Sequence, residues 1–332
     1  MLEVVNLRAG LIGMGTMGRH HARVLSLIEG VDFIGVADPD PSVKLAAGIP
    51  VYASVEALLD AGLDYCVLAV PTAEHLHVAL QLAEYGVHTL VEKPLAENST
   101  GAKKIADAFE SASLVGAVGH VERYNPALIQ ARDRIASGEL GDLYQIATRR
   151  TGPFPERISD VGVVLDLATH DIDLTSWVAQ APYNSISAQS AHKSGRLHED
   201  IIAAVGLLSN SVTTNHLVNW LSPLKERQTL IYGDRGTFQV DTLTGDLTFY
   251  QNGVVQTVWD DVSKFRGVTE GNVTRFAFPK VEPLLSEHIA FRDAIYGLSA
   301  NIVTMRQGLE TIAVAEAMLE SARNSVTVNL RY

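Results

Sequence analysis

A glycine-rich turn near the start of the chain limits the fold more than any other feature. Gly13-Met14-Gly15-Thr16-Met17-Gly18 follows an apolar run, Leu7–Ile12, and opens a stretch of helical character. In strand–turn–helix units that bind dinucleotides, the first glycine makes the tight turn, the second admits the pyrophosphate, and the third lets the helix pack on the strand. The sequence therefore predicts a doubly wound α/β unit that binds a dinucleotide at a helix N-terminus.

Asp38 indicates which dinucleotide is bound. It ends the next apolar run, about twenty residues after the turn, where a carboxylate accepts hydrogen bonds from the adenosine ribose hydroxyls. A carboxylate repels a 2′-phosphate, so the pattern favours NAD over NADP. Arg19 follows the turn and is either a contact for a 2′-phosphate or a solvated charge on a helix surface.

Hydrophobic periodicity divides the chain into two parts. Up to about Gly119, short β-type runs alternate with amphipathic helical stretches, which is typical of a parallel sheet with helices on both faces. After Asn125, short strand-like runs follow one another, which indicates a mostly antiparallel sheet. We therefore predict an α/β protein with an N-terminal Rossmann domain, residues 1–122, and a C-terminal α+β domain, residues 123–332. The second domain is expected to carry an open-faced sheet, to bind substrate and to form oligomers.

The expected elements are defined to within a few residues. The strands are Leu7–Ile12, Phe33–Ala37, Tyr65–Ala69, Thr89–Val91, Leu114–Val118, Tyr144–Thr151, Ser185–His192, Asp200–Leu208, Ser211–Leu221, Gln228–Tyr232, Thr237–Val240, Leu247–Gln251 and Val254–Trp259. The helices are Met17–Leu27, Val55–Asp60, His75–Tyr85, Thr100–Ser111, Pro126–Ser137, Val161–Gln180 behind an Asp160 N-cap, Glu282–Tyr296 and Met305–Asn324.

Composition excludes several classes of partner. The 332 residues carry a net charge of -12, which opposes binding to the phosphate backbone of nucleic acids. No apolar run approaches the roughly 20 residues that cross a bilayer, so no membrane association and a cytoplasmic location are expected. The single cysteine, Cys66, lies in an apolar run typical of a buried strand, which leaves neither a disulfide framework nor a Cys-rich metal site.

Two groups of residues are candidates for chemistry. Lys93, in Glu92-Lys93-Pro94, follows a predicted strand, and ligands of open α/β sheets bind at the carboxyl ends of the strands; a surface charge is the alternative. Asp166 and His170 have the i,i+4 spacing of one helix face, which suits a general base near neutral pH or, alternatively, a simple surface pair. With Asp171 they make a poor tetrahedral zinc set, so no metal is expected.

Several of these motifs together resemble the Gfo/Idh/MocA oxidoreductase family along essentially the whole chain. The resemblance rests on the glycine-rich turn, on Ala69-Val70-Pro71-Thr72 with His75, on Val91-Glu92-Lys93-Pro94-Leu95, and on Gly162 to Asp173 with its Asp-x-x-x-His pair. It implies that Lys93, Asp166 and His170 are catalytic and that NAD is the cofactor. The cofactor-binding residues that we expect are Gly13, Gly15, Thr16, Met17, Gly18, Asp38, Val70, Pro71, Thr72, His75, Glu92 and Lys93.

A second group of segments resembles the nucleotide-sugar 3-dehydrogenase branch of that family. These segments are Gly119 to Ala127, Thr151 to Pro155 and Arg157 to Gly162. The resemblance implies hydride transfer from C3 of UDP-N-acetylglucosamine or a related sugar. The candidate substrate residues are Lys93, His120, Arg123, Tyr124, Asn125, Arg149, Arg157, Asp166 and His170, and Arg150 is a further candidate for the diphosphate.

Other readings of these residues stay open. Instead of binding sugar, Arg123 and Tyr124 could brace the two domains against each other, and the other arginines could be surface charges. The side chains of a predicted strand in the second domain point either toward sugar or toward another subunit; they are Asn215, His216 and Asn219. The alternative functions are a dehydrogenase of free polyols such as inositol, a non-catalytic sensor of NAD or sugar nucleotide, and an NAD-dependent glycosidase. An uncovered sheet face predicts a homodimer or homotetramer, although the alternation of Val212, Leu217 and Val218 fits it loosely.

Overall fold

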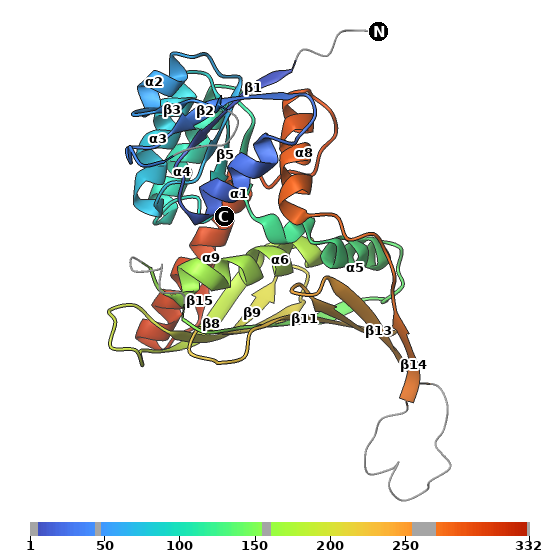
Figure 1. Cartoon of the computed structure of the whole chain (residues 1–332). Coiled ribbons are helices and arrows are strands. Elements are labelled where there is room, and N and C mark those ends of the chain that lie inside the picture. The colour runs from blue at the N-terminus through green and yellow to red at the C-terminus, as the bar shows by residue number, and fades with distance from the viewer. Residues whose placement is uncertain (1–5, 44–47, 155–160, 254–269, 331–332) are drawn as a thin grey trace, which may run out of the picture. The chain divides into compact units, whose positions relative to one another are not determined.

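The computed structural model groups the chain into two compact units, coloured by residue number in Figure 1. Unit 1 is Met1–Val121 with Glu282–Ala313, and unit 2 is Glu122–Val281 with Val314–Tyr332. The residues that the structure describes are 6–43, 48–154, 161–253 and 270–330. The sequence did not lead us to expect that residues 282–313 return to unit 1, and the division at residue 122 stays a prediction about domains.

Unit 1 is a doubly wound α/β unit, as predicted. Its sheet has six parallel strands in the order β3-β2-β1-β4-β5-β6. The strands are β1 (Leu7–Ile12), β2 (Val31–Ala37), β3 (Val51–Tyr52), β4 (Tyr65–Leu68), β5 (His88–Glu92) and β6 (Gly116–Gly119). The helices are α1 (Thr16–Leu25), α2 (Val55–Leu59), α3 (Thr72–Glu84), α4 (Ser99–Ser111), α8 (Pro283–Ile295) and the first part of α9 (Met305–Asn324).

Both faces of this sheet are buried, and alternate residues of β4 show how. Cys66 and Leu68 face a core shared with α2, α3 and α4, whereas Tyr65 and Val67 belong to a second core with residues of α1 and with Phe291 of α8. Burial on both sides explains why the strand reads as an unbroken apolar run rather than an alternating one. Helix α8, distant in sequence, therefore completes one face of the unit 1 sheet.

Unit 2 contains one nine-stranded sheet in the order β14-β13-β12-β11-β7-β10-β9-β8-β15. Its pairs are antiparallel except for β7 with β10, which confirms the mostly antiparallel sheet. The strands are β7 (Leu143–Thr151), β8 (Tyr183–Ala191), β9 (Ile201–Leu208), β10 (Thr213–Asn219), β11 (Glu226–Gly233), β12 (Gly236–Asp241), β13 (Asp246–Asn252), β14 (Glu270–Arg275) and β15 (Val328–Asn329). The helical segments are η2 (Val121–Tyr124), α5 (Pro126–Ala136), η3 (Val164–Ala168), α6 (Thr169–Ala179) and the end of α9.

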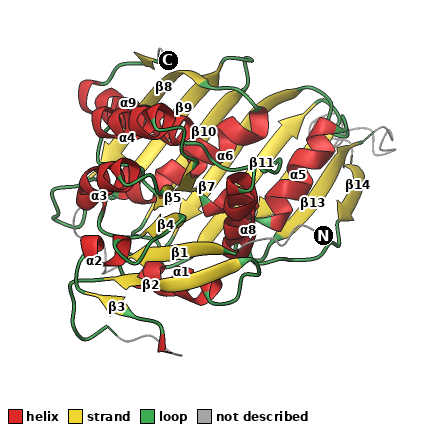
Figure 2. Ribbon diagram, turned by 90° about the horizontal axis from the view of Figure 1, so that it is seen from above, coloured by secondary structure: helices red, strands yellow, loops and turns green. Residues whose placement is uncertain are grey.

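Helices cover one face of this sheet. Residues of α5, α6 and the end of α9 share a core with inward residues of the strands, and Figure 2 shows these helices above the sheet. From Ile202 to Leu208, strand β9 alternates between buried and exposed residues, the pattern of a sheet with one covered face. Val212 and Val218 are buried, whereas Leu217, Val205 and Leu207 are exposed on the other face.

Some predicted elements need correction. The helix expected over Val161–Gln180 is a π-helical segment, η3, followed by α6. It begins at Val164 rather than Val161, where the N–H groups of Val163 and Val164 bond to Glu199. The short strands β3 and β15, the strand β14 and the turn η2 were missed. The predicted strand Val254–Trp259 and the predicted cap Asp160 lie outside the described residues. In the described part of the chain, no helix is long and apolar enough to cross a membrane.

Candidate active site

The glycine-rich turn joins β1 to α1. Gly13 has a φ of 92°, and a Cβ on Gly18 would lie 2.0 Å from the Gly13 carbonyl oxygen, so the turn and the helix contact both require glycine. At Gly15, the N-cap of α1, a Cβ would meet nothing within 4 Å. Thr16 and Met17 begin α1 beside this open space. The space at the helix N-terminus therefore fits a pyrophosphate.

Asp38 is held next to this turn. Its Oδ2 accepts a hydrogen bond from the Met14 backbone N–H at 2.7 Å, and its Oδ1 accepts one from the Asp40 N–H at 2.9 Å. Each carboxylate oxygen has a further lone pair, so the group can still accept bonds from ribose hydroxyls. The position and the chemistry of Asp38 therefore fit the adenosine ribose of NAD.

His75 connects two segments that the sequence assigned to the cofactor. It is 1% exposed, with Nδ1 2.9 Å from the Pro94 carbonyl oxygen and Nε2 3.0 Å from the Val70 carbonyl oxygen. Burial lowers the pKa of His75, and a neutral ring donates to only one of the two carbonyls at a time. The side chain thus ties Val70-Pro71-Thr72, after β4, to the segment after β5.

Glu92 and Lys93 lie at the carboxyl end of β5. The Glu92 carboxylate is buried, with Oε2 3.1 Å from the Lys93 backbone N–H and Oε1 2.8 Å from Nε2 of His21 on α1. Burial alone would raise the pKa of Glu92, but the His21 hydrogen bond and nearby positive charge outweigh it, so this pKa is lowered. His21 continues the chain of contacts to His288 on α8, at 2.8 Å. Lys93 itself is partly exposed, and its peptide bond to Pro94 is cis.

Asp166 and His170 lie on consecutive helical segments of unit 2. Asp166 is 5% exposed in η3, and the partly exposed His170 is the second residue of α6. The turn between them is π-helical, a rare form that is frequent at functional sites. Glu199 fixes its start by accepting a hydrogen bond from the Val164 N–H at 2.9 Å. Gly162 leaves room for this carboxylate, because a Cβ there would lie 2.0 Å from Glu199 Oε1.

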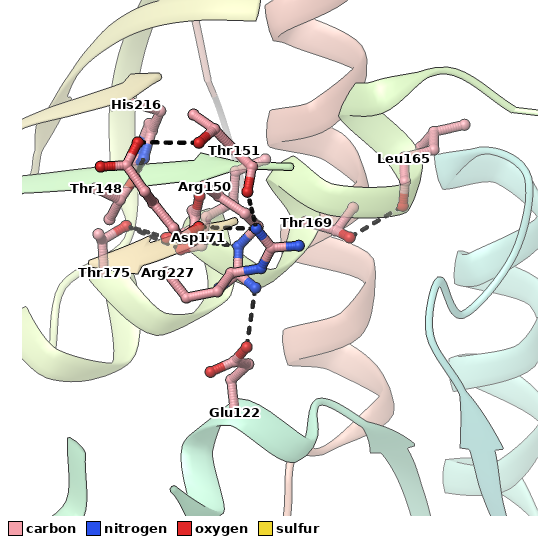
Figure 3. Close-up of polar contacts among 12 residues, drawn as sticks. Glu122, Thr148, Arg150, Thr151, Leu165, Thr169, Asp171, Thr175, His216 and Arg227 are labelled. Carbon is pink, nitrogen blue, oxygen red and sulfur yellow. Dashed lines mark hydrogen bonds and ion pairs between the residues drawn. The ribbon is translucent and has the colours of Figure 1, made fainter. Parts of the chain in front are cut away.

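A buried ion-pair network lies beside the start of α6 (Figure 3). The Arg150 Nε donates to Asp171 Oδ1 at 2.9 Å, and its Nη1 donates to Glu122 Oε1 at 2.9 Å. Burial opposes the charge on Arg150, yet the two carboxylates raise its pKa. Burial raises the pKa of Asp171, and Arg150 opposes that rise. The Arg150 guanidinium, a candidate for the diphosphate, is therefore occupied by two carboxylates.

Within unit 2, the segment from Glu122 onward contacts α6 and the turn after β12. Arg123 donates to Asp173 of α6 from Nε and Nη2 at 2.8 and 2.6 Å, a two-pronged pair. Asn125 caps α5 by accepting from the Ala127 N–H and donates to the Thr242 carbonyl. Tyr124 is 8% exposed. Arg123 thus braces η2 against α6, within one unit.

The other predicted substrate residues have different surroundings. His120 is buried in unit 1, whereas Arg149 is exposed and pairs with Glu226 at 3.0 Å. Arg157 lies outside the described residues. His216 points into the covered face, between Thr148 and Tyr183, and burial lowers its pKa to about 3.

Sequence reasoning missed five residues that organise these sites. They are His21, Glu122, Asp171, Glu199 and Arg227. Apart from the bond of Arg227 to the carbonyl of its neighbour Glu226, the partners of these side chains are 21 or more positions away, so local spacing carries no signal for them. Asp171 was weighed only as a zinc ligand. Across the described ranges, no group of three His, Cys, Asp or Glu side chains is placed to hold a metal ion.

The parallel sheet, the glycine-rich turn and the placement of Asp38 define a Rossmann-type protein whose dinucleotide site suits NAD. Comparison with known families agrees along nearly the whole chain. The model described as "Oxidoreductase family, NAD-binding Rossmann fold" matches residues 7–120, and that of its "C-terminal alpha/beta domain" matches residues 132–330. The chain belongs to the Gfo/Idh/MocA oxidoreductase family.

Individual relatives are moderately similar. The chain is 28% identical to the UDP-N-acetylglucosamine 3-dehydrogenase of Acidithiobacillus ferrooxidans over 75% of this chain and 79% of the relative. A solved structure of that enzyme superposes with a TM-score of 0.83 at 25% identity, covering 96% of this chain and 99% of the other. The scyllo-inositol 2-dehydrogenase of Bacillus subtilis is 28% identical over 54% of this chain and 56% of the relative.

Proposed function

We propose that this oxidoreductase removes a hydride from C3 of UDP-N-acetylglucosamine or a closely related nucleotide sugar. The observation that carries the proposal is the similarity to a UDP-N-acetylglucosamine 3-dehydrogenase, which extends through both units at 25% identity. The scyllo-inositol 2-dehydrogenase matches 54% of the chain, and another inositol 2-dehydrogenase, of Rubrobacter xylanophilus, matches 72% at 26% identity, against 75% at 28% for the UDP-N-acetylglucosamine 3-dehydrogenase. The side chains of Lys93 in unit 1 and of Asp166 and His170 in unit 2 are of the types that oxidation of a hydroxyl group needs.

In the proposed reaction, each candidate residue has a separate task. NAD, when bound at the glycine-rich turn and Asp38, supplies the hydride acceptor. His170 takes the proton from the sugar hydroxyl, because imidazole is suited to general base catalysis near neutral pH. Lys93 donates a hydrogen bond to the same oxygen and stabilises its developing negative charge. Asp166 orients the substrate or the imidazole.

A panel of substrates tests this function. The full-length protein and NAD are mixed in separate wells with UDP-N-acetylglucosamine, other nucleotide sugars, inositol and free sugars, and absorbance of NADH is followed. We expect a signal confined to UDP-sugar wells and absent from the His170→Ala variant. A signal with free polyols alone would replace the proposal with the inositol-type activity. Silence in every well would leave a sensor or a cycling glycosidase as the better description.

Isotopic labelling tests the position that is oxidised. UDP-N-acetylglucosamine with deuterium at C3 should transfer that deuterium to the reduced cofactor, and its turnover should be slower. The matched control carries deuterium at C4 and should retain it in the sugar. Transfer from C4 would keep the substrate and overturn the assignment to C3.

We also propose that two or four copies of the chain associate through the uncovered face of the unit 2 sheet. Val205 is 54% exposed, Leu207 42% and Leu217 38%, and they lie on the neighbouring strands β9 and β10. An exposed apolar face of this kind is typical of subunit interfaces. Light scattering at micromolar concentration should give a dimer or tetramer, and Leu207→Glu should shift the mass toward a monomer. A wild-type monomer would contradict the proposal.

We also propose that the protein acts in the cytoplasm. Cys66 is a free and fully buried thiol. A free thiol suits a reducing compartment.

A further inference from the structure

The start of α6 is held on two sides by buried ion pairs. Asp171 and Asp173 follow His170 on the helix and are each 2% exposed. Each accepts hydrogen bonds from a buried arginine on a different element, Arg150 of β7 and Arg123 of η2. Residues one and three positions after His170 are therefore fixed to two separate parts of unit 2.

Arg150 has the richer set of contacts of the two arginines. Its side chain is 5% exposed, and it links Asp171 to Glu122 through separate nitrogens, as Figure 3 shows. Glu122 adjoins Arg123, so both arginines connect α6 with η2. Three elements, β7, α6 and η2, are thus joined at one guanidinium.

Stability alone does not account for this arrangement. Removing charges from water costs several kcal/mol for each ion, and well-packed apolar side chains often stabilise a protein equally well. The pairing with Asp171 also uses one carboxylate oxygen, and the buried Oδ2 has no hydrogen-bond partner among the described residues. A charge is kept here although one carboxylate oxygen has no partner among the described residues, and this charge is next to the proposed base in sequence.

We infer that Arg150 and Asp171 form a positioning pair for His170, which fixes the direction of its imidazole and balances the charge beside it. This inference rests on the proposed function, in which His170 is the general base. The Arg150 fork sets the first turn of α6 relative to β7. The Asp171 carboxylate, adjacent in sequence to His170, favours a positive charge on the imidazole, and Arg150 moderates that effect.

Charged and titratable groups surround the start of α6 from every element near it. They are Asp166 on η3, Asp171 and Asp173 on α6, Glu122 and Arg123 on η2, Arg150 on β7, His216 on β10, Arg227 on β11 and Glu199 before β9. Among these groups, Asp171 is the one directly next to His170 in sequence. Its charge can be removed by an isosteric substitution. Asp171→Asn therefore isolates one charge while it keeps the shape of the side chain.

The test is an NMR titration of the His170 imidazole in the full-length protein, with the signal assigned by its loss in His170→Ala. Asp171→Asn leaves the Arg150 charge with one fewer partner, so the His170 midpoint should fall by about half a pH unit or more. The double variant Arg150→Gln with Asp171→Asn removes one charge of each sign, and the midpoint should return toward the wild-type value. A merely structural role would not restore it.

A second variant separates position from charge. Arg150→Lys keeps the charge but loses the planar fork, so kcat should fall about tenfold while KM changes less and the midpoint stays in place. Arg275→Gln breaks an exposed pair with Asp246 in the same unit and is the matched control, which should change neither quantity. Arg150→Lys also covers the case in which Asp171→Asn fails to fold.

The outcomes distinguish this inference from the proposed function. An unmoved midpoint in Asp171→Asn, an equal shift in Arg275→Gln, or wild-type kcat in Arg150→Lys would each overturn the positioning pair, even if the enzyme oxidises UDP-N-acetylglucosamine. A shifted midpoint in a protein that oxidises no sugar would support the pair's effect on His170 and overturn the proposed function instead, because the titration needs no substrate.

Discussion

Replacing His170 with Ala, or Lys93 with Met, should lower turnover about a hundredfold or more while NAD binding survives. In the proposed mechanism, the first change removes the group that takes the proton, and the second removes the positive charge that stabilises the oxygen from which the proton leaves. Neither residue belongs to the glycine-rich turn at which we propose that the pyrophosphate binds. Steady-state rates with the active sugar, together with NAD affinity by calorimetry, measure the two effects separately.

Matched controls for these variants come from exposed residues of the same type. Lys103→Met removes an exposed lysine that pairs with Asp107, and His77→Ala removes an exposed histidine of α3. Both should keep wild-type turnover. Near-wild-type turnover in Lys93→Met and His170→Ala would remove both residues from the proposed mechanism, and a parallel loss of NAD affinity would assign them to cofactor binding instead.

Two glycines of the turn should respond to Ala in different ways. In Gly18→Ala the new methyl group would lie 2.0 Å from the Gly13 carbonyl oxygen, so α1 must move away from β1. We expect a loss of about 1–3 kcal/mol of stability together with loss of NAD binding. In Gly15→Ala the methyl group enters open space, so the apoprotein should keep its melting temperature. The pyrophosphate must approach this position closely, so NAD affinity should fall at least about tenfold.

Melting curves with and without NAD check this contrast. Wild-type protein should melt at a higher temperature with NAD, because a ligand that binds only the folded state stabilises it. Gly15→Ala should lose most of that rise and nothing else, whereas Gly18→Ala should start from a lower temperature. Equal behaviour of the two variants would contradict the separate roles of the two glycines.

The parts of the fold that local patterns encode were predictable. The run Leu7–Ile12 and the helix Met305–Asn324 have the predicted bounds. The first is a short continuous apolar run that ends at the glycine-rich turn, and the second has the period of a long amphipathic helix. The glycine-rich turn was equally predictable, since no other residue fits at Gly13 or Gly18 without a shift of the neighbouring backbone. Very short strands such as β3, Val51–Tyr52, offer too few residues for any period.

What sequence reasoning missed depends on contacts between distant residues. The start of η3 is bonded to Glu199, 35 positions after Val164, so no local cap marked where the helix begins. Arg150 read as a phosphate contact because its two carboxylates, Glu122 and Asp171, are 28 and 21 positions away. A charged residue gives no periodic signal of burial, and only the folded chain shows that this one is paired.

The return of Glu282–Ala313 to unit 1 affects how such enzymes can be recombined. Neither unit is one uninterrupted stretch, because the chain passes from one to the other after Val121, after Val281 and again within α9, after Ala313. A chimera that keeps this cofactor unit and borrows a relative's substrate unit therefore needs three junctions rather than one. A single splice near residue 122 would also import the relative's α8, whose Phe291 counterpart must fit against Tyr65 of the retained sheet. Exchange of substrate specificity by one genetic crossover is thus constrained by packing in the cofactor unit.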